Sequence, residues 1–243
     1  MKKIILTLLA LVGTMSMNAQ VIEVMKNGEV VATFTADQAD EVVFKEETTG
    51  TEKRTGGVSV NWVQLWENGP KFAEYNVGAT SATEYGGYYT WGGAYNNNPN
   101  LEGFEWTDDH NEGTDALSGD NDTATNLWGS KWRMPTQAEL KALLANCDVE
   151  WTKDYKGDKT NIKGRIFTGK GDYKDNSVFL PAAGSCSDGD VSGQGIIGIY
   201  WSSTPNGMYN AYYLGFDSNG QSVTDSYREI GRSVRAVLNE VVE

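Results

Sequence analysis

Residues 128–136 read Trp-Gly-Ser-Lys-Trp-Arg-Met-Pro-Thr and lead directly into the best-defined helix of the sequence. Thr136 is a good N-cap, and Glu139, three residues later, completes a capping box. Leucines then recur at helical spacing, at Leu140, Leu143 and Leu144. We therefore predict a helix that begins after Thr136 and ends near Asn146.

The two tryptophans of this stretch flank a glycine at the turn into the helix. This position predicts that Trp128 and Trp132 pack against the base of the helix. Arg133 lies at the same turn, and we expect a carboxylate or backbone carbonyls to hold its guanidinium. A second, shorter helix is expected over Asp122–Trp128.

The chain from Val58 onward reads mainly as short strands. All eight tryptophans lie between Trp62 and Trp201, and short apolar runs alternate with Gly, Asn and Asp turns. One strong helix and one short one among many strands predict an α+β domain that is β-rich and has long loops.

Four further motifs accompany residues 128–136 in a fixed order. They are Asn-Val-Gly-Ala at 76–79 with a Tyr/Gly run at 85–92, Phe-Leu-Pro-Ala-Ala-Gly at 179–184, Tyr-Trp-Ser-Ser at 200–203 and Ser-Val-Arg-Ala-Val at 233–237. Together they resemble the Fibrobacter succinogenes major paralogous domain family. The resemblance covers about residues 58–238. It implies a C-type-lectin-like fold of the sulfatase-modifying-factor, or formylglycine-generating-enzyme-like, branch, in which these motifs form core and scaffold.

The chain departs from this resemblance at several cysteine and proline positions. Formylglycine-generating enzymes use a cysteine pair near the end of the domain, but no cysteine follows Cys186 here, so that activity does not carry over. Many relatives carry a cysteine where this chain has Tyr75, with its partner at the position of Cys147. Relatives also usually have proline where Ala236 stands.

The start of the chain reads as a secretory signal peptide over residues 1–19, with two lysines, an apolar run and a small residue before the expected cleavage after Ala19. Residues 20–46 read as a small β module, with strands over 21–25 and 30–34 around an Asn27-Gly28 turn. A helical turn at 35–39 and a third strand at 42–44 complete this expectation. Residues 47–57 have the composition of a linker. We expect a periplasmic, cell-surface or extracellular protein without a membrane span.

The net charge excludes two classes of partner, and the two cysteines bear on whether the fold contains a disulfide. The net charge is −13, and signal-peptide cleavage removes two lysines, so nucleic acid and anionic membranes would repel the chain. Export places Cys147 and Cys186 in an oxidising compartment, where they can form a disulfide. Two buried free thiols are the alternative, and the sequence leaves both open.

Tests for catalytic and metal chemistry give no candidate. The single histidine, His110, lies in an acidic loop, and no Gly-x-Ser-x-Gly elbow presents a nucleophile. The calcium-binding signatures of lectins are missing, and neither 120–122 nor 188–190 completes a calcium-loop pattern. We expect no catalytic residue and no cofactor, although a structural calcium in a loop is compatible with the sequence.

The segment from Tyr200 to Arg235 is the candidate binding face. A strand over 210–216 should alternate faces. Tyr212, Leu214 and Phe216 should point inward, and Ala211, Tyr213 and Gly215 outward. Tyrosine offers contact area at low entropic cost, and Asn offers adaptable hydrogen bonds. The expected ligand-binding residues are Asn206, Tyr209, Asn210, Tyr213, Asn219, Asp225, Tyr227 and Glu229.

This face predicts an exported domain for protein or glycan recognition or adhesion, without enzymatic activity. In related domains diversified by retroelements, the same region carries the variable ligand-contacting positions, and the chain resembles such a target in texture. Two alternatives stay open. One is a carbohydrate-active enzyme on a lectin-like fold, and the other is a structural component of a cell-surface assembly.

Overall fold

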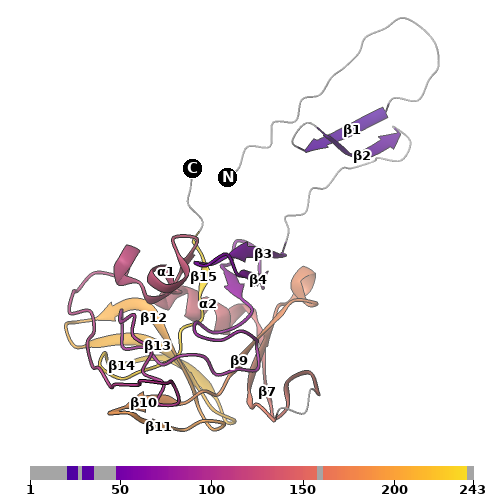
Figure 1. Ribbon diagram of the computed structural model, residues 1–243. Coiled ribbons are helices and arrows are strands. Elements are labelled where there is room, and N and C mark those ends of the chain that lie inside the picture. Colours follow the sequence, from indigo (N-terminus) through magenta and orange to yellow (C-terminus); the bar gives the residue numbers. More distant parts are fainter. Residues whose placement is uncertain (1–20, 27–28, 36–47, 158–160, 240–243) are drawn as a thin grey trace, which may run out of the picture. The chain divides into compact units, whose positions relative to one another are not determined.

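The computed structural model describes residues 21–239, apart from 27–28, 36–47 and 158–160 (Figure 1). The chain divides into two compact units, of which the larger spans Glu47–Val241. The smaller unit contains β1 (Val21–Lys26) paired antiparallel with β2 (Glu29–Thr35), which confirms the two strands predicted there. The predicted signal peptide, the 27–28 turn and the 42–44 strand lie outside the described residues. So does the predicted 35–39 helical turn, except for Thr35, which ends β2.

The first large sheet of the larger unit has five strands, in the order β3-β4-β5-β15-β6. Its strands are β3 (Thr49–Lys53), β4 (Ser59–Gln64), β5 (Lys71–Ala73), β15 (Val237–Leu238) and β6 (Trp132–Arg133). Val237 pairs with Phe72 on one side and with Arg133 on the other. The last strand therefore lies between β5 and β6 and joins them into one sheet.

Strand β3 corrects the expected linker over 47–57. Thr49–Lys53 pairs with β4, and Gly50 lies opposite Trp62. A Cβ added at Gly50 would come within 2.5 Å of the Trp62 ring, so only glycine leaves room for the indole there. The polar composition that suggested a linker belongs to an edge strand whose residues are exposed or half-buried.

The other sheets are smaller and antiparallel. One has the order β7-β8-β9, one β12-β13-β14, and a short hairpin pairs β10 with β11. Their bounds are β7 (Asp148–Thr152), β8 (Gly164–Thr168), β9 (Ser177–Pro181), β10 (Ser185–Ser187), β11 (Asp190–Ser192), β12 (Gly198–Asn206), β13 (Asn210–Phe216) and β14 (Gln221–Tyr227). Three 3₁₀ turns cover Gly119–Asn121, Tyr155–Gly157 and Gly171–Tyr173.

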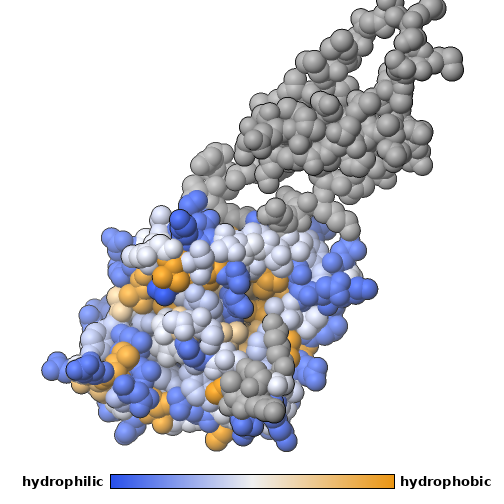
Figure 2. Space-filling view, turned by 45° about the vertical axis from the view of Figure 1, so that its right-hand side comes forward, coloured by the Kyte–Doolittle hydropathy of each residue, from blue (hydrophilic) through white to orange (hydrophobic). Residues whose placement is uncertain are grey.

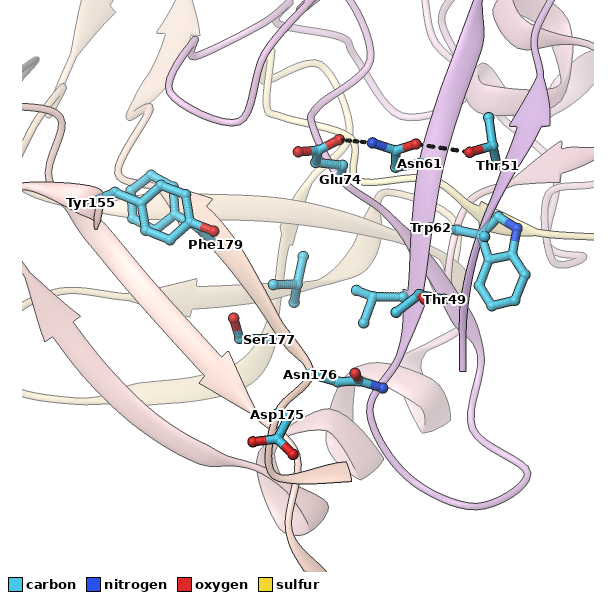
Figure 3. A pocket seen from close by; sticks show the side chains of 13 residues that line it. Thr49, Thr51, Asn61, Trp62, Glu74, Tyr155, Asp175, Asn176, Ser177 and Phe179 are labelled. Atoms are coloured by element: carbon cyan, nitrogen blue, oxygen red, sulfur yellow. Dashed lines mark hydrogen bonds between the residues drawn. The ribbon is translucent and has the colours of Figure 1, made fainter. Parts of the chain in front are cut away.

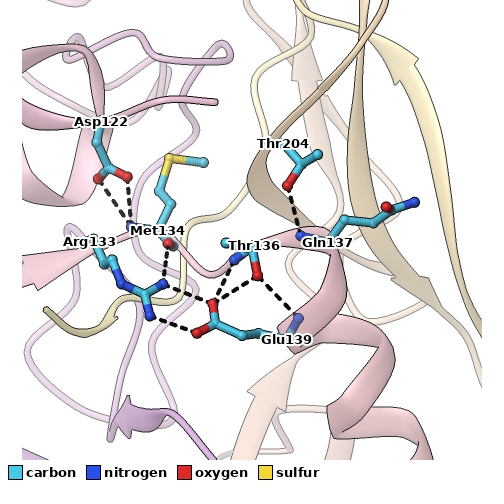
Figure 4. Close-up of polar contacts among 7 residues, drawn as sticks. All are labelled: Asp122, Arg133, Met134, Thr136, Gln137, Glu139 and Thr204. Atoms are coloured by element: carbon cyan, nitrogen blue, oxygen red, sulfur yellow. Dashed lines mark hydrogen bonds and ion pairs between the residues drawn. The ribbon is translucent and has the colours of Figure 1, made fainter. Parts of the chain in front are cut away.

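Both predicted helices are present, as α1 (Thr123–Trp128) and α2 (Gln137–Asn146). Thr136 caps α2, and the reciprocal bonds of a capping box with Glu139 are formed (Figure 4). Arg133 donates to both carboxylate oxygens of Glu139, which confirms the expected carboxylate partner. Asp122 caps α1 and also accepts from the backbone N–H of Met134, so one buried carboxylate joins the two helical elements.

Two hydrophobic clusters cover opposite faces of the β12-β13-β14 sheet. Trp201 and Ala211 belong to the first cluster, which also holds Trp128 and Trp132. Leu214 and Phe216 belong to the second, together with Leu140 and Leu143 of α2. The inward prediction for Leu214 and Phe216 is thus confirmed. The outward prediction for Ala211 is wrong, because the sheet is buried on both sides there and Ala211 is fully inaccessible.

A fully buried arginine connects the sheets at the end of the chain. The Arg235 guanidinium donates to Asn76 Oδ1, to the carbonyl oxygens of Ala73 and Glu74 on one side, and to that of Phe179 on the other. Arg235 therefore ties β5 to β9. The motif that contains it is scaffold, as expected.

The larger unit is β-rich, with two α-helices and several small antiparallel sheets, which confirms the α+β class. On the face that Figure 2 presents, hydrophobic residues of this unit form small patches among polar ones. Among the described residues, neither helix has the length and apolar character needed to cross a bilayer.

Candidate binding surface

The candidate site lies where the β12–β13 hairpin turns. Asn206 pairs with Asn210 across the hairpin, and Asn210 pairs with Tyr227 of β14. Directly opposite residues of neighbouring strands project on the same side of a sheet, so these three side chains form one row. We call Asn206, Met208, Tyr209, Asn210, Asp225 and Tyr227 the hairpin tip.

The hairpin tip exposes large apolar side chains. Tyr209 is 73% exposed, Met208 61% and Tyr227 60%. An apolar side chain that stays in water gains nothing for folding, so two such side chains on the turn and a third beside them, on β14, need another explanation. Tyrosine and methionine are enriched in protein interfaces, which is the explanation that this composition favours.

A buried arginine, Arg228, binds the backbone of the hairpin tip. Arg228 is completely inaccessible, and its guanidinium lies 4.2 Å from the centre of the Trp91 ring. It donates to the carbonyl oxygens of Gly207 and Asn210 in the hairpin, at 2.7 and 3.1 Å. It also donates to the carbonyls of Asn111 and Gly113, both at 2.8 Å. The turn is thereby joined to a loop about a hundred residues earlier in the chain.

Polar contacts order the row itself. The Asn210 side-chain amide donates to Asp225 Oδ2 at 2.8 Å, between neighbouring strands. Gly207 takes up a positive φ of +69°, which a residue with a side chain adopts less readily. The exposed side chains thus stand on a turn whose backbone and polar neighbours are already fixed.

Three of the predicted residues lie away from this row. Asn219 is exposed on the β13–β14 turn at the other end of the sheet, and its backbone N–H donates to Asp217 Oδ1. Glu229 is half-buried just after Arg228. The structure therefore brings together Asn206, Tyr209, Asn210, Asp225 and Tyr227, but not the full set of eight.

Tyr213 is the third, and its predicted outward orientation needs correction. Its ring is half-buried, meets the Trp201 ring edge-on at 6.1 Å and lies 4.1 Å from the Arg232 guanidinium. The same guanidinium lies 4.3 Å from the Trp201 ring. Burial lowers the pKa of Arg232 to about 10, although Tyr213 and Glu229 act in the opposite direction. Tyr213 belongs mainly to this packed group, because the face of β13 that holds it is covered.

Sequence reasoning missed Met208 and Arg228. Met208 was overlooked because polar and aromatic residues defined the predicted face. Arg228 gave no signal, since its carbonyl partners at 111 and 113 leave no pattern in the sequence near it. A charged residue beside an exposed tyrosine gives no signal that it is buried.

The other candidate groups take structural positions. His110 Nδ1 lies 2.6 Å from the carbonyl oxygen of Asp108 in its own loop. Cys147 and Cys186 are free and buried in different hydrophobic clusters, so the structure shows the two-thiol alternative and not the disulfide. Within the described part of the chain, no three His, Cys, Asp or Glu side chains converge as metal ligands would.

Comparison with known sequences gives one match. Residues 151–237 match a family described as a domain of unknown function, DUF8237, and this range contains the whole β12-β13-β14 sheet. No curated protein and no solved structure matches the chain.

Proposed function

We propose that this is an exported, non-catalytic recognition protein that binds a protein ligand through the hairpin tip. The observation that carries the proposal is the group of three large, exposed apolar side chains, with Met208 and Tyr209 on the turn that Arg228 binds and Tyr227 on the adjacent β14. Export rests on the signal-peptide pattern of residues 1–19.

Preorganisation is the physical reason that this turn suits recognition. Association costs free energy whenever side chains and loops must be ordered at the interface. Here the backbone carbonyls of Gly207 and Tyr209 already accept from Arg228, so the cost falls mainly on the side chains of Met208, Tyr209 and Tyr227. Tyrosine has few rotatable bonds for its area, which keeps that remaining cost low.

The finer fold assignment belongs to the same proposal. We assign residues 58–238 to the C-type-lectin-like fold, with the first strand of the unit at Thr49. Support comes from the motif residues Trp132, Trp201 and Arg235, which are all buried at contacts between segments far apart in the chain. A domain of this kind presents its ligand-contacting positions on loops and strand ends, where the hairpin tip lies.

The test is binding of the exported chain to a panel of purified secreted and surface proteins. Tyr209→Ala and Tyr227→Ala should each weaken a hit by about tenfold or more, as interface tyrosines commonly do. Ile196→Ala is the matched control, because Ile196 is 65% exposed but lies outside the tip. A hit that both tyrosine variants bind as tightly as the unaltered chain would exclude the hairpin tip as its site.

A further inference from the structure

A recess lies away from the hairpin tip, between strands β3 to β5 and the start of β9. It is an open groove of about 450 Å³ (Figure 3). This volume falls within the usual range for small-ligand sites. Its lining residues are Thr49, Gly50, Thr51, Asn61, Trp62, Val63, Glu74, Tyr155, Asp175, Asn176, Ser177, Val178 and Phe179.

One wall carries a chain of polar side chains with fixed orientation. Thr51 Oγ1 donates to Asn61 Oδ1 at 2.9 Å, and Asn61 Nδ2 donates to Glu74 Oε2 at 2.8 Å (Figure 3). The Glu74 backbone N–H donates to the Asn61 carbonyl, and the Glu74 carbonyl accepts from buried Arg235. The amide of Asn61 is therefore held in one orientation, and Glu74 is held on a rigid base.

The opposite wall is polar at its rim and aromatic behind it. The Asn176 amide donates to the carbonyl of Gln64 at 2.8 Å, which ties this wall to the end of β4. Asp175 and Ser177 stand on either side of Asn176 (Figure 3). Tyr155 stacks on Phe179, with ring centres 4.2 Å apart and planes 8° from parallel. The groove thus combines hydroxyl, amide and carboxylate groups with an apolar backing.

The balance of charge selects the class of ligand. The lining contains two carboxylates, Glu74 and Asp175, and none of its residues is basic. An anionic ligand would meet a repelling carboxylate on each wall, and the nearby Lys71 ammonium already lies over the Trp62 ring, 4.8 Å from its centre. Glu74 already accepts from Asn61, and hydroxyl and amide groups outnumber carboxylates, so the lining is not matched to a single ammonium group either.

We propose that this groove binds a neutral sugar unit of a glycan. Sugar hydroxyls donate and accept at once, which suits neighbouring carboxylate, amide and hydroxyl groups. Val63 and the Tyr155 ring offer apolar contact to the C–H groups of a sugar face. The proposal concerns a site separate from the hairpin tip and does not depend on the protein-binding role of the tip.

The experiment is a glycan array with the exported chain, carrying neutral, amino and acidic oligosaccharides, followed by titration calorimetry of the best hit. Neutral oligosaccharides should bind best. Asn61→Ala removes the amide that joins Thr51 to Glu74, and it should weaken binding at least about tenfold, as unpaired polar groups do. Asn100→Ala is the matched control, because it removes an exposed, hydrogen-bonded amide that lies in neither the groove nor the hairpin tip.

Glu74→Gln provides a second variant in case Asn61→Ala does not fold, which thermal melting would reveal. It keeps the shape of the side chain but removes the charge, and it should also weaken neutral-glycan binding. The proposal is overturned if no neutral glycan binds the folded chain, or if binding survives both substitutions. A preference for acidic or amino sugars, or cleavage of the bound glycan, would overturn it as well.

Discussion

The guanidinium of Arg133 binds both carboxylate oxygens of Glu139, with N–O distances of 2.8 and 2.6 Å. This pair ties the first turn of α2 to β6 and so to the five-stranded sheet. Burial by itself would raise the pKa of Glu139, but the bonds from Arg133 and Thr136 outweigh it and lower the pKa below its usual value. The carboxylate thus stabilises the fold in its charged form.

Glu139→Gln should lower the free energy of unfolding by about 1–3 kcal/mol at neutral pH, as expected for a lost charge-assisted hydrogen bond. Urea denaturation would measure the change. Asp148→Asn is the control, since it removes the exposed 3.5 Å pair with Lys170 and should cost less than about 1 kcal/mol. Equal effects of the two substitutions would contradict a special role for the Arg133–Glu139 pair.

The dependence of stability on pH should differ between Glu139 and Asp122. Glu139 has a lowered pKa in the folded state, so its contribution is present above its unfolded pKa and lost as pH falls through the folded one. Burial raises the pKa of Asp122, although backbone bonds from Thr125 and Met134 act against the shift. Its contribution is therefore present below its unfolded pKa and lost as pH rises through the folded one.

Denaturation of Glu139→Gln and Asp122→Asn across pH 3 to 7 would separate the two contributions. On acidification, the unaltered chain should lose its advantage over Glu139→Gln. As pH rises, it should lose stability relative to Asp122→Asn. If the stability of both variants followed that of the unaltered chain at a constant offset across this pH range, neither carboxyl would titrate as its surroundings imply.

Asp122→Ala should be markedly destabilising, by about 2–3 kcal/mol, because it removes the cap of α1 and leaves the Met134 N–H without its acceptor. Asp122→Asn retains an acceptor oxygen and should cost less. Thermal melting of the two variants would rank them. A smaller loss for alanine than for asparagine would contradict the capping role.

Arg228→Lys should loosen the hairpin tip without removing the positive charge. A lysine ammonium cannot reproduce the planar fork that reaches four carbonyl oxygens. We expect a loss of about 2–4 kcal/mol and faster amide hydrogen exchange at 207–210 and 111–113. Tyr209→Ala is the control and should change stability by less than about 0.5 kcal/mol. Unchanged amide exchange in Arg228→Lys would show that Arg228 does not hold the hairpin tip in place.

The cysteine thiols should be unreactive in the native protein. Burial raises the pKa of Cys147 to about 12 and that of Cys186 to about 11, so neither forms appreciable thiolate near neutral pH. Titration with a thiol reagent should detect almost nothing before denaturation and two thiols after it. Finding no thiol in the denatured chain would show that a disulfide forms after all.

Local signals predicted the local structure well. The capping box at Thr136, the leucine spacing and the 21–35 hairpin are encoded within short windows, and each element is found where it was expected. The errors come from long-range contacts. Strand β3 exists because β4 lies beside it, and Tyr213 turns inward because Trp201 and Arg232 cover that face.

In the candidate site, too, local features were predicted and long-range contacts were not. Tyr209 and Tyr227 are exposed, as their position near turns suggested. Alternation along a single strand could not show that the two faces of β13 are covered by different clusters. Nor could it show the groove beside β9, whose walls come from two separate segments, 49–74 and 155–179.

Arg228 donates hydrogen bonds to the hairpin only at backbone carbonyl oxygens, and every residue type supplies such an oxygen. These hydrogen bonds from Arg228 therefore do not depend on which side chains occupy positions 206, 208 and 209. These positions can change identity without weakening the attachment of the turn. Substitutions there would change the exposed surface at little cost in stability, while the architecture beneath it stays the same.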